Sequence, residues 1–297
     1  MISLYKSLKI ITLSLFFTGI IGCDYLPQNS ILRNTISSDS SIVNSFTPQD
    51  SLKSEDTFID SLQIATNVNQ SNIDSTKNYV YLTFDDGPYK GSEKINKIIK
   101  EEQVKATVFI VGMNAYTKTL QQYLKDYEEN DFIEISNHTY SHANRNKFKA
   151  YYDNPQMVLN DVRRNDSVYH FKNRFVRLPG RNVWRLGNDI KNDYDKGSRH
   201  SSDFLAQNQY YILGWDYEWN KTNKNNPLKN PQDIYDGIVK RLEKKETFKE
   251  KHLVILMHDD MFDNNEDAEQ LRQLIRLIKS NKNIIFETAS NYPVSLS

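Results

Sequence analysis

The stretch "YVYLTFDDGPYKGS", residues 79–92, decides how this chain folds. Its first six residues are apolar, β-branched or aromatic, a composition that predicts a buried β-strand. The strand ends on two adjacent carboxylates, Asp85 and Asp86, and Gly87 and Pro88 then break the chain. Two negative charges side by side at the end of a core strand raise the question of what they do there.

Six further strand-like runs follow this first one, and helical patterns lie between them. The runs occupy residues 106–111, 132–136, 174–178, 210–215, 253–257 and 283–287. Apolar residues recur at helical spacing in two of the intervening segments, 92–102 and 269–280. Strands that alternate with helices predict parallel βα units, and about seven such units predict a barrel or a related closed sheet.

Chemically capable residues follow five of the seven predicted strands. Because the carboxyl ends of barrel strands surround one mouth, we expect these residues to lie close together. They are Asp85 and Asp86 after the first strand, "NHTYSH" (137–142) after the third, "RLPG" (177–180) after the fourth, "WDYEW" (215–219) after the fifth and "MHDD" (257–260) after the sixth.

The histidines of "NHTYSH" indicate a metal site. His138 and His142 are four residues apart and can meet on one face of a helix or turn. Alone, such a pair is more often structural, but a carboxylate at a neighbouring strand end completes the three-ligand set of a catalytic divalent metal. Imidazole and carboxylate ligands favour Zn²⁺, although Co²⁺, Ni²⁺, Fe²⁺ or Mn²⁺ could occupy such a site.

The paired carboxylates can then divide two roles between them. One binds the metal, and the other serves as the base for the water that the metal activates. The alternative for an Asp-Asp-Gly sequence is a solvated surface turn. His258 is a suitable general acid because histidine titrates near neutral pH. Arg177 could hold the free Asp by a charge-assisted hydrogen bond, its alternative being a surface salt bridge.

Five short sequences resemble, in their order along the chain, the five motifs of the polysaccharide deacetylase family, the NodB-like carbohydrate esterase family 4. They are "TFDDGP", "NHTYSH", "RLPG", "WDYEW" and "ILMHD". The resemblance covers about residues 78–290. It implies a distorted (β/α)7 barrel and removal of N- or O-acetyl groups from polysaccharides such as peptidoglycan, chitin and xylan.

The resemblance also implies a role for each matching residue. Asp85 is expected to be the base, Asp86, His138 and His142 the metal ligands, Arg177 the residue that orients Asp85, and His258 the acid. Of the "RLPG" motif, Pro179 and Gly180 are expected at the substrate, with the Gly180 N–H donating to the oxyanion, while Leu256 and Trp219 line a pocket for the acetyl methyl group. The fourth motif departs from the family pattern, so either Glu218 or, in a shifted register, Asp216 tunes His258. Glu218 is the preferred choice.

We therefore expect a metal-dependent hydrolase that removes N-acetyl groups from an extracytoplasmic polysaccharide, either peptidoglycan or another N-acetylglucosamine polymer. Two alternatives remain open: an O-acetyl esterase or other amide hydrolase that uses the same site, and a catalytically silent glycan-binding lipoprotein. The polar segment 181–202 is either one wall of a sugar-binding groove, in which Trp184 stacks on a ring, or an ordinary surface loop.

The N-terminal region predicts the location of the protein. Basic residues precede an apolar run over residues 10–22, which has signal-peptide length, and Cys23 follows it in the sequence "IIGC". This resembles a bacterial lipoprotein signal with Cys23 as the lipidated residue; an ordinary secretory signal is the alternative. We expect a signal peptide (1–22), a flexible tether (23–77) and the catalytic domain (78–297), attached to a membrane through the lipid alone.

The overall charge argues against nucleic acid as a partner. The chain of 297 residues carries 38 Lys and Arg against 38 Asp and Glu, so its formal net charge is zero. The sequence makes no prediction about the oligomeric state.

Overall fold

The computed structural model describes residues 74–193, 197–221 and 228–295. Ten strands within these ranges form one sheet. The strands are β1 (Asn78–Gly87), β2 (Ala106–Ile110), β3 (Ile133–Asn137), β4 (Phe175–Val176), β5 (Trp184–Leu186), β6 (Asp189–Lys191), β7 (Tyr211–Ile212), β8 (Tyr217–Glu218), β9 (His252–His258) and β10 (Ile284–Phe286). Their order is β6-β5-β7-β4-β3-β2-β1-β9-β8, and β10 pairs with the beginning of β1.

The pairing is parallel except at β5 and β6, which form an antiparallel hairpin at one edge. No pairing joins β6 to β8 in the described part of the chain, so the sheet is an incompletely closed barrel. This confirms the predicted fold class. The seven strands expected from sequence correspond to β1, β2, β3, β4, β7, β9 and β10, whereas the short strands β5, β6 and β8 were not predicted.

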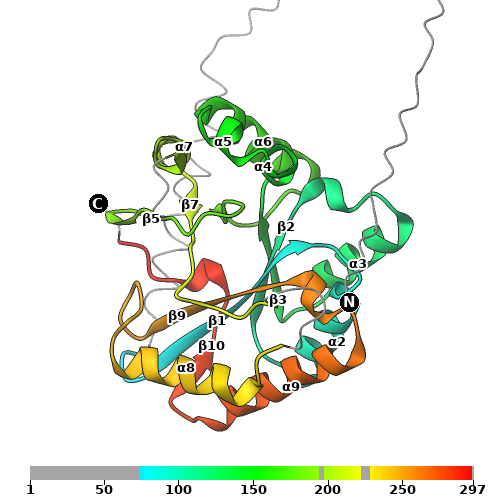
Figure 1. The fold of residues 1–297 in the computed structure, drawn as a ribbon, viewed down its shortest axis with the longest axis vertical. Coiled ribbons are helices and arrows are strands. Elements are labelled where there is room, and N and C mark those ends of the chain that lie inside the picture. The colour runs from blue at the N-terminus through cyan, green and yellow to red at the C-terminus, as the bar shows by residue number, and fades with distance from the viewer. Residues whose placement is uncertain (1–73, 194–196, 222–227, 296–297) are drawn as a thin grey trace, which may run out of the picture. The chain divides into compact units, whose positions relative to one another are not determined.

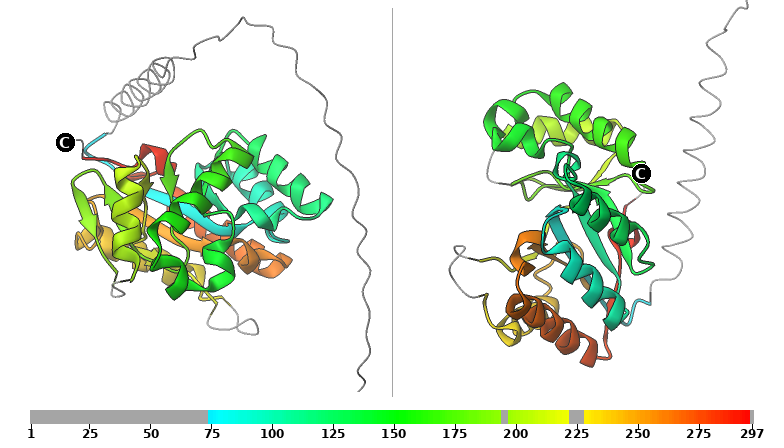
Figure 2. Two further views of the ribbon diagram at one scale, coloured as in Figure 1. Left: turned by 90° about the horizontal axis from the view of Figure 1, so that it is seen from above. Right: turned by 90° about the vertical axis from the view of Figure 1, so that its right-hand side faces the viewer.

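Helices lie between most of the strands. They are α2 (Ser92–Glu102), α3 (Lys118–Glu128), α4 (His142–Asn146), α5 (Phe148–Tyr152), α6 (Pro155–Tyr169), α7 (Gly197–Gln207), α8 (Pro231–Glu243) and α9 (Asn265–Ser280), with the 3₁₀ turns η1 (Gly112–Asn114), η2 (Asp259–Phe262) and η3 (Ala289–Asn291). Helices α2, α8 and α9 flank β1 and β9, while α5, α6 and α7 gather near β7 (Figure 1). Views from two further directions show the same two groups of helices (Figure 2).

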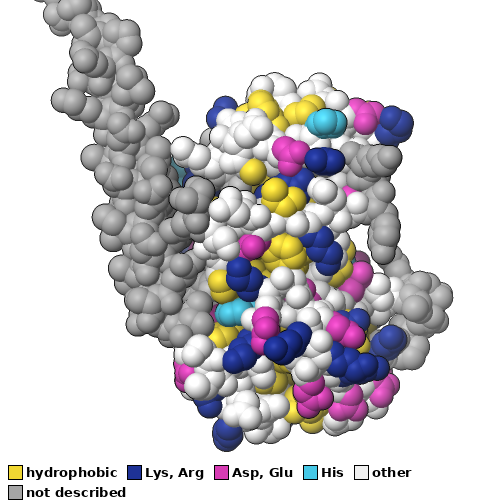
Figure 3. Space-filling view, turned by 90° about the vertical axis from the view of Figure 1, so that its left-hand side faces the viewer, with side chains coloured by type: hydrophobic (Ala, Val, Ile, Leu, Met, Phe, Trp, Pro, Cys, Tyr) yellow, Lys and Arg dark blue, Asp and Glu magenta, His cyan; other side chains and the backbone are white. Residues whose placement is uncertain are grey.

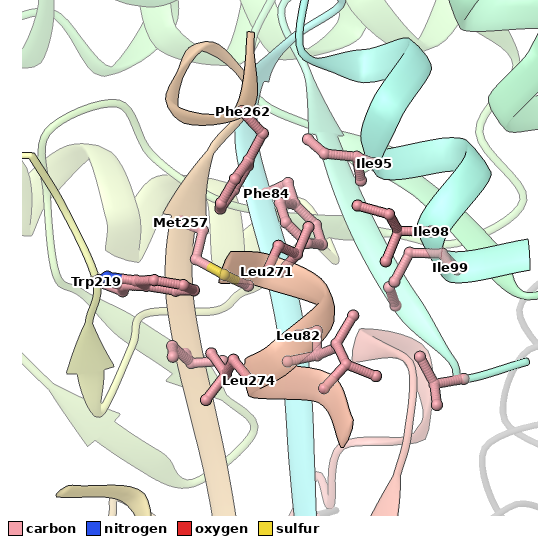
Figure 4. Packing of buried hydrophobic residues seen from close by; sticks show 14 of the residues in the cluster. Leu82, Phe84, Ile95, Ile98, Ile99, Trp219, Met257, Phe262, Leu271 and Leu274 are labelled. Carbon is pink, nitrogen blue, oxygen red and sulfur yellow. The ribbon is translucent and has the colours of Figure 1, made fainter. Parts of the chain in front are cut away.

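The main hydrophobic core lies between β1, β9 and these flanking helices. Alternate residues of β1, Val80, Leu82 and Phe84, point towards α2 and α9 and are fully buried. The apolar faces predicted for 92–102 and 269–280 also enter this core, as Figure 4 shows for Ile95, Ile98, Ile99, Leu271 and Leu274. Burying such aliphatic side chains contributes roughly 1.5–3 kcal/mol each. The core therefore fixes the two strands that carry Asp85 and His258.

The surface agrees with the balanced composition. On the face in Figure 3, Lys and Arg side chains lie among Asp and Glu side chains rather than in a patch of one sign. Within the described ranges, no helix combines the length and apolar character needed to cross a membrane. The predicted signal peptide, Cys23 and nearly all of the predicted tether lie outside the described residues.

Candidate metal centre and active site

The two carboxylates at the end of β1 have different surroundings. Tyr81, Thr83 and Asp85 alternate with the residues that enter the main core, so their side chains face the interior of the barrel. Asp86 has a positive φ of 72°, and the β1–β2 register shifts between Phe84 and Gly87. This change of backbone geometry lets adjacent carboxylates serve different partners.

Asp86 forms a cluster with the two predicted histidines. Its Oδ1 atom lies 3.0 Å from His142 Nε2 and 3.3 Å from His138 Nε2. His138 follows β3 and is buried, while His142 begins the short turn α4. One ligand atom from each of the three residues lies within 4.8 Å of the others. The structure therefore brings together the three residues predicted as metal ligands.

Hydrogen bonds on the far side of each ring orient its metal-facing nitrogen. His138 Nδ1 lies 2.8 Å from the backbone oxygen of Arg177, and His142 Nδ1 lies 2.5 Å from Asn146 Oδ1. Both partners are acceptors, so each neutral ring carries its proton on Nδ1 and presents the Nε2 lone pair. Asp86 Oδ1, which is buried without a hydrogen-bond partner, faces both lone pairs. Three electron-rich atoms around one point fit a bound cation.

Charge within the cluster depends on the same contacts. Burial opposes ionisation of Asp86, but without a metal the two histidine rings can donate to it when they are protonated, and this holds the pKa of Asp86 well below its usual value. Burial opposes protonation of His142, yet Asp86 outweighs it and raises the pKa of His142. The cluster thus favours a carboxylate at Asp86, the form that binds metal.

Asp85 is held by a buried arginine. Arg177 is fully buried, and its Nη1 donates to Asp85 Oδ1 at 2.9 Å and to Thr83 Oγ1 at 2.6 Å. The remaining guanidinium nitrogens donate to the backbone oxygens of Leu213 and Gly214 at 3.2 and 3.0 Å. Burial lowers the pKa of Arg177, and Asp85 opposes that shift. The arrangement fixes the Asp85 carboxylate 3.7 Å from His138 Nε2, beside the metal cluster.

His258 is the residue directly across from Asp85 in the neighbouring strand. The parallel register pairs Asp85 with His258 and Thr83 with Leu256. Paired residues on adjacent strands project to the same face, so Leu256 and His258 share the barrel interior with Asp85. The structure therefore brings the predicted acid and the predicted base to one end of the sheet.

The two candidates for tuning His258 occupy different places. The carboxylate of Asp216 accepts from the backbone N–H groups of Phe248 and Val254 at 2.6 and 2.9 Å, and burial raises its pKa to about 6. Val254 precedes His258 by four strand residues, about 13 Å along the strand. Glu218 pairs with Leu256, on the face that bears His258. This register favours Glu218, although no hydrogen bond joins it to His258 among the described residues; its carboxylate accepts from Asn220 at 3.0 Å.

Trp219 differs from the prediction. It is fully buried in the main core, where Figure 4 places it beside Met257 and near Phe262. Trp219 follows Glu218, so it points to the opposite face of the sheet from Leu256. The two side chains therefore do not line one pocket in this structure. The strand alternation that directs Glu218 inward necessarily directs Trp219 outward.

The "RLPG" loop lies against the turn that carries His142. Pro179 O accepts from Tyr152 Oη at 2.6 Å, and Gly180 has a φ of +65°, a conformation suited to glycine. A Cβ atom on Gly180 would lie 3.2 Å from the Phe148 ring, and that ring packs edge-on against His142 with centroids 6.3 Å apart. Gly180 is thereby positioned near the metal cluster, as predicted.

Several residues of the site were missed by the sequence reasoning. Thr83 lies two residues before Asp85, and this strand spacing could have indicated its contact with Arg177. Asn146 lies four residues after His142, a spacing that could have indicated a contact across one turn. Phe148 carried no such signal. Trp184, considered as a sugar-stacking residue, is fully buried and stacks on Phe248 with ring centroids 4.3 Å apart.

Comparisons with known proteins find similarity to deacetylases. A curated relative, the chitin disaccharide deacetylase of Vibrio alginolyticus, is 26% identical over 206 residues, which represent 48% of this chain and 48% of the relative. The chain thus spans about half the length of the curated relative it matches.

Two solved structures share the fold. One is a CE4 esterase of Streptococcus mutans, with 20% identity and a TM-score of 0.53 over 74% of this chain and 90% of that chain. The other is the catalytic domain of peptidoglycan N-acetylglucosamine deacetylase from Eubacterium rectale ATCC 33656, with 18% identity and a TM-score of 0.51 over 76% of this chain and 94% of that chain. Residues 72–183, which include three of the five motifs, match the family model described as polysaccharide deacetylase. Over these residues the chain is similar to the polysaccharide deacetylase family.

Proposed function

We propose that this protein is a metal-dependent deacetylase that removes N-acetyl groups from an extracytoplasmic N-acetylglucosamine polymer, with peptidoglycan as the first candidate. The observation that carries the proposal is that the two adjacent carboxylates at the end of β1 have different partners. Asp86 faces two histidine nitrogens, while its neighbour Asp85 is held by Arg177 at 2.9 Å. One carboxylate is thus committed to a cation and the other is kept free for proton transfer.

The ligands of the cation are Asp86, His138 and His142, and Zn²⁺ is the metal best suited to them. When bound, a divalent cation lowers the pKa of a water molecule and polarises the acetyl carbonyl. Three protein ligands would leave coordination positions for the water molecule and for the acetyl carbonyl oxygen.

The residues of the chain then carry out the proton transfers. Asp85 accepts a proton from the water as the water oxygen forms a bond with the acetyl carbon. The backbone N–H of Gly180 donates to the carbonyl oxygen, where negative charge develops. His258 gives a proton to the amide nitrogen as the C–N bond breaks, so the products are acetate and a free amine. Arg177 holds Asp85 in position, and Glu218 shares the face of His258 and supports its charge.

The choice of substrate rests on two arguments. The curated relative is named for deacetylation of chitin disaccharide, and one structural neighbour is named for peptidoglycan N-acetylglucosamine. The lipoprotein-like segment ending at Cys23 directs the enzyme outside the cytoplasm, where a cell-wall polymer is accessible. Incorporation of labelled fatty acid into the full chain, and its loss in Cys23→Ser, tests the lipid anchor independently of the activity.

Acetate release tests the activity itself. The full chain is incubated with N-acetylglucosamine oligomers and with peptidoglycan, in the presence of Zn²⁺ or a chelator. We expect Zn²⁺-dependent release that Asp85→Asn lacks and that Asp260→Asn, a change at an exposed residue of the η2 turn, retains. Zinc binding by Asp85→Asn confirms that this variant is folded.

Other outcomes discriminate among the alternatives. Release from acetyl esters but not from the amides would replace N-deacetylation with O-deacetylation. Glycan binding without release, with zinc demonstrably bound, would refute the enzymatic proposal.

A further inference from the structure

The metal ligand His142 begins a helical turn of the wrong hand. Five consecutive residues, His142, Ala143, Asn144, Arg145 and Asn146, have φ between 49° and 65°. Their turn is closed by hydrogen bonds of helical spacing, from Arg145 N to Ser141 O at 2.8 Å and from Lys147 N to Ala143 O at 3.0 Å. Segment α4 is therefore one turn of left-handed helix.

This conformation is unfavourable for most of its residues. A left-handed helix places Cβ near the following carbonyl oxygen, which is unfavourable for each L-residue other than glycine, with asparagine the least affected. Such a segment persists only when its surroundings determine it, and such segments cluster at functional sites. None of the five residues is glycine, and only two are asparagine.

The surroundings hold the turn at both ends. Ser141 Oγ accepts from Asn144 N at 2.9 Å, while the Ser141 hydroxyl donates to Asp161 Oδ2 at 2.8 Å. At the other end, Asn146 Oδ1 lies 2.5 Å from His142 Nδ1. Residues four apart share a face in a helical turn of either hand, and here that relation joins a metal ligand to a side-chain acceptor.

We propose that Asn146 is a positioning residue for the metal centre. Its Oδ1 accepts the Nδ1–H of His142 and so keeps the Nε2 lone pair directed at Asp86, 3.0 Å away. The turn α4 places Asn146, four residues after His142, within reach of the ring. The hydrogen-bond partner of the other histidine, His138, is a backbone oxygen, which a side-chain substitution does not remove. The side chain of Asn146, in contrast, can be removed by substitution.

Substitutions at Asn146 separate the hydrogen bond from the backbone conformation. Asn146→Gly removes the acceptor but adopts positive φ freely, whereas Asn146→Ala removes the acceptor and adds backbone strain. Asn146→Asp keeps an acceptor. The matched control is Asn144→Gly, because Asn144 is exposed in the same turn and, among the described residues, its side chain makes no hydrogen bond to a proposed metal ligand.

The experiment measures Zn²⁺ affinity of the full chain by competition with a chromophoric chelator. Loss of a second-shell partner weakens metal binding by about 10–100-fold, and the exposure of Asn146 places the expected loss near tenfold. We expect this loss in Asn146→Gly and Asn146→Ala, and wild-type affinity in Asn146→Asp and Asn144→Gly. Nitrogen-15 NMR of histidine in the zinc-loaded protein supplies a second readout, because the Nδ1–H signal of His142 should exchange faster with water in Asn146→Gly.

The inference rests on the proposed metal site but not on the proposed substrate. Wild-type affinity together with an unchanged Nδ1–H signal in Asn146→Gly would overturn it, because the residue would then serve only the backbone. Failure of the wild-type chain to bind Zn²⁺ would instead overturn the metal site in the proposed function.

Discussion

Glycine at position 145 should stabilise this protein, although glycine ordinarily weakens a helix. Arg145 is exposed, has a φ of 57° and lies in the left-handed turn α4. Relief of the left-handed Cβ contact gains roughly 1–2 kcal/mol, and the greater freedom of glycine in the unfolded chain costs about 0.5–1 kcal/mol. Because no apolar surface is lost at an exposed position, we expect Arg145→Gly to raise the free energy of unfolding by about 0.5–1 kcal/mol.

The matched control is Gln273→Gly, at an exposed position within the right-handed helix α9. There glycine should lower the free energy of unfolding by about 0.5–1 kcal/mol. Urea denaturation of metal-free protein measures both, as opposite shifts of the midpoint at an unchanged slope. If Arg145→Gly is destabilised as much as Gln273→Gly, the turn is not left-handed in solution and the argument for Asn146 loses its geometric basis.

Three other perturbations probe buried charges and the metal. Burial raises the pKa of Asp259 to about 7 from 3.8, so the folded state binds its proton more tightly and stability falls as the pH rises between these values. Between pH 5 and pH 7 this amounts to about 2 kcal/mol, and urea titrations should show that Asp259→Asn lacks this loss. Arg177→Met leaves Asp85 charged and unpaired in the interior, and denaturation should show a loss of about 3–5 kcal/mol; a loss below 1 kcal/mol would contradict the buried ion pair. Zinc at 100 times its dissociation constant should stabilise the wild type by about 2.7 kcal/mol, and calorimetry should find this increment missing in Asp86→Asn.

The positions of Asp85 and His258 could be predicted because strand periodicity and strand ends are local properties of the sequence. The run before Asp85 and the run before His258 each end where the chain leaves the core, and parallel pairing then places the two residues side by side. The alternation of side chains along a strand, which is also a local rule, would have corrected the prediction for Trp219. Alternation along β8 requires Glu218 and Trp219 to face opposite sides, so Trp219 cannot share a pocket with Leu256, which pairs with Glu218.

The loops between strands obey no comparable rule, and the rest of the site is built from them. Asp259 illustrates this: its buried carboxylate accepts from Tyr127 at 3.1 Å and also from Ser92, and a Cβ on Gly87 would lie 2.5 Å from its Oδ2. Glycine at position 87 is thus required by a residue that is distant in the sequence, and no local pattern around "DDGP" indicates that contact.

The hand of α4 is the clearest case of a feature that residue propensity cannot supply. Ala143 and Arg145 are strong formers of right-handed helix, yet both adopt positive φ. The conformation is determined by the contacts of Ser141 with Asp161 and of His142 with Asn146. Asp161 and Asn146 both lie outside the "NHTYSH" motif. The motif therefore supplies the residues that we propose as metal ligands, whereas residues outside it determine how those side chains are oriented. Changes at Asn146 are expected to alter metal affinity while the five motifs stay intact, so motif matching alone would not reveal the loss.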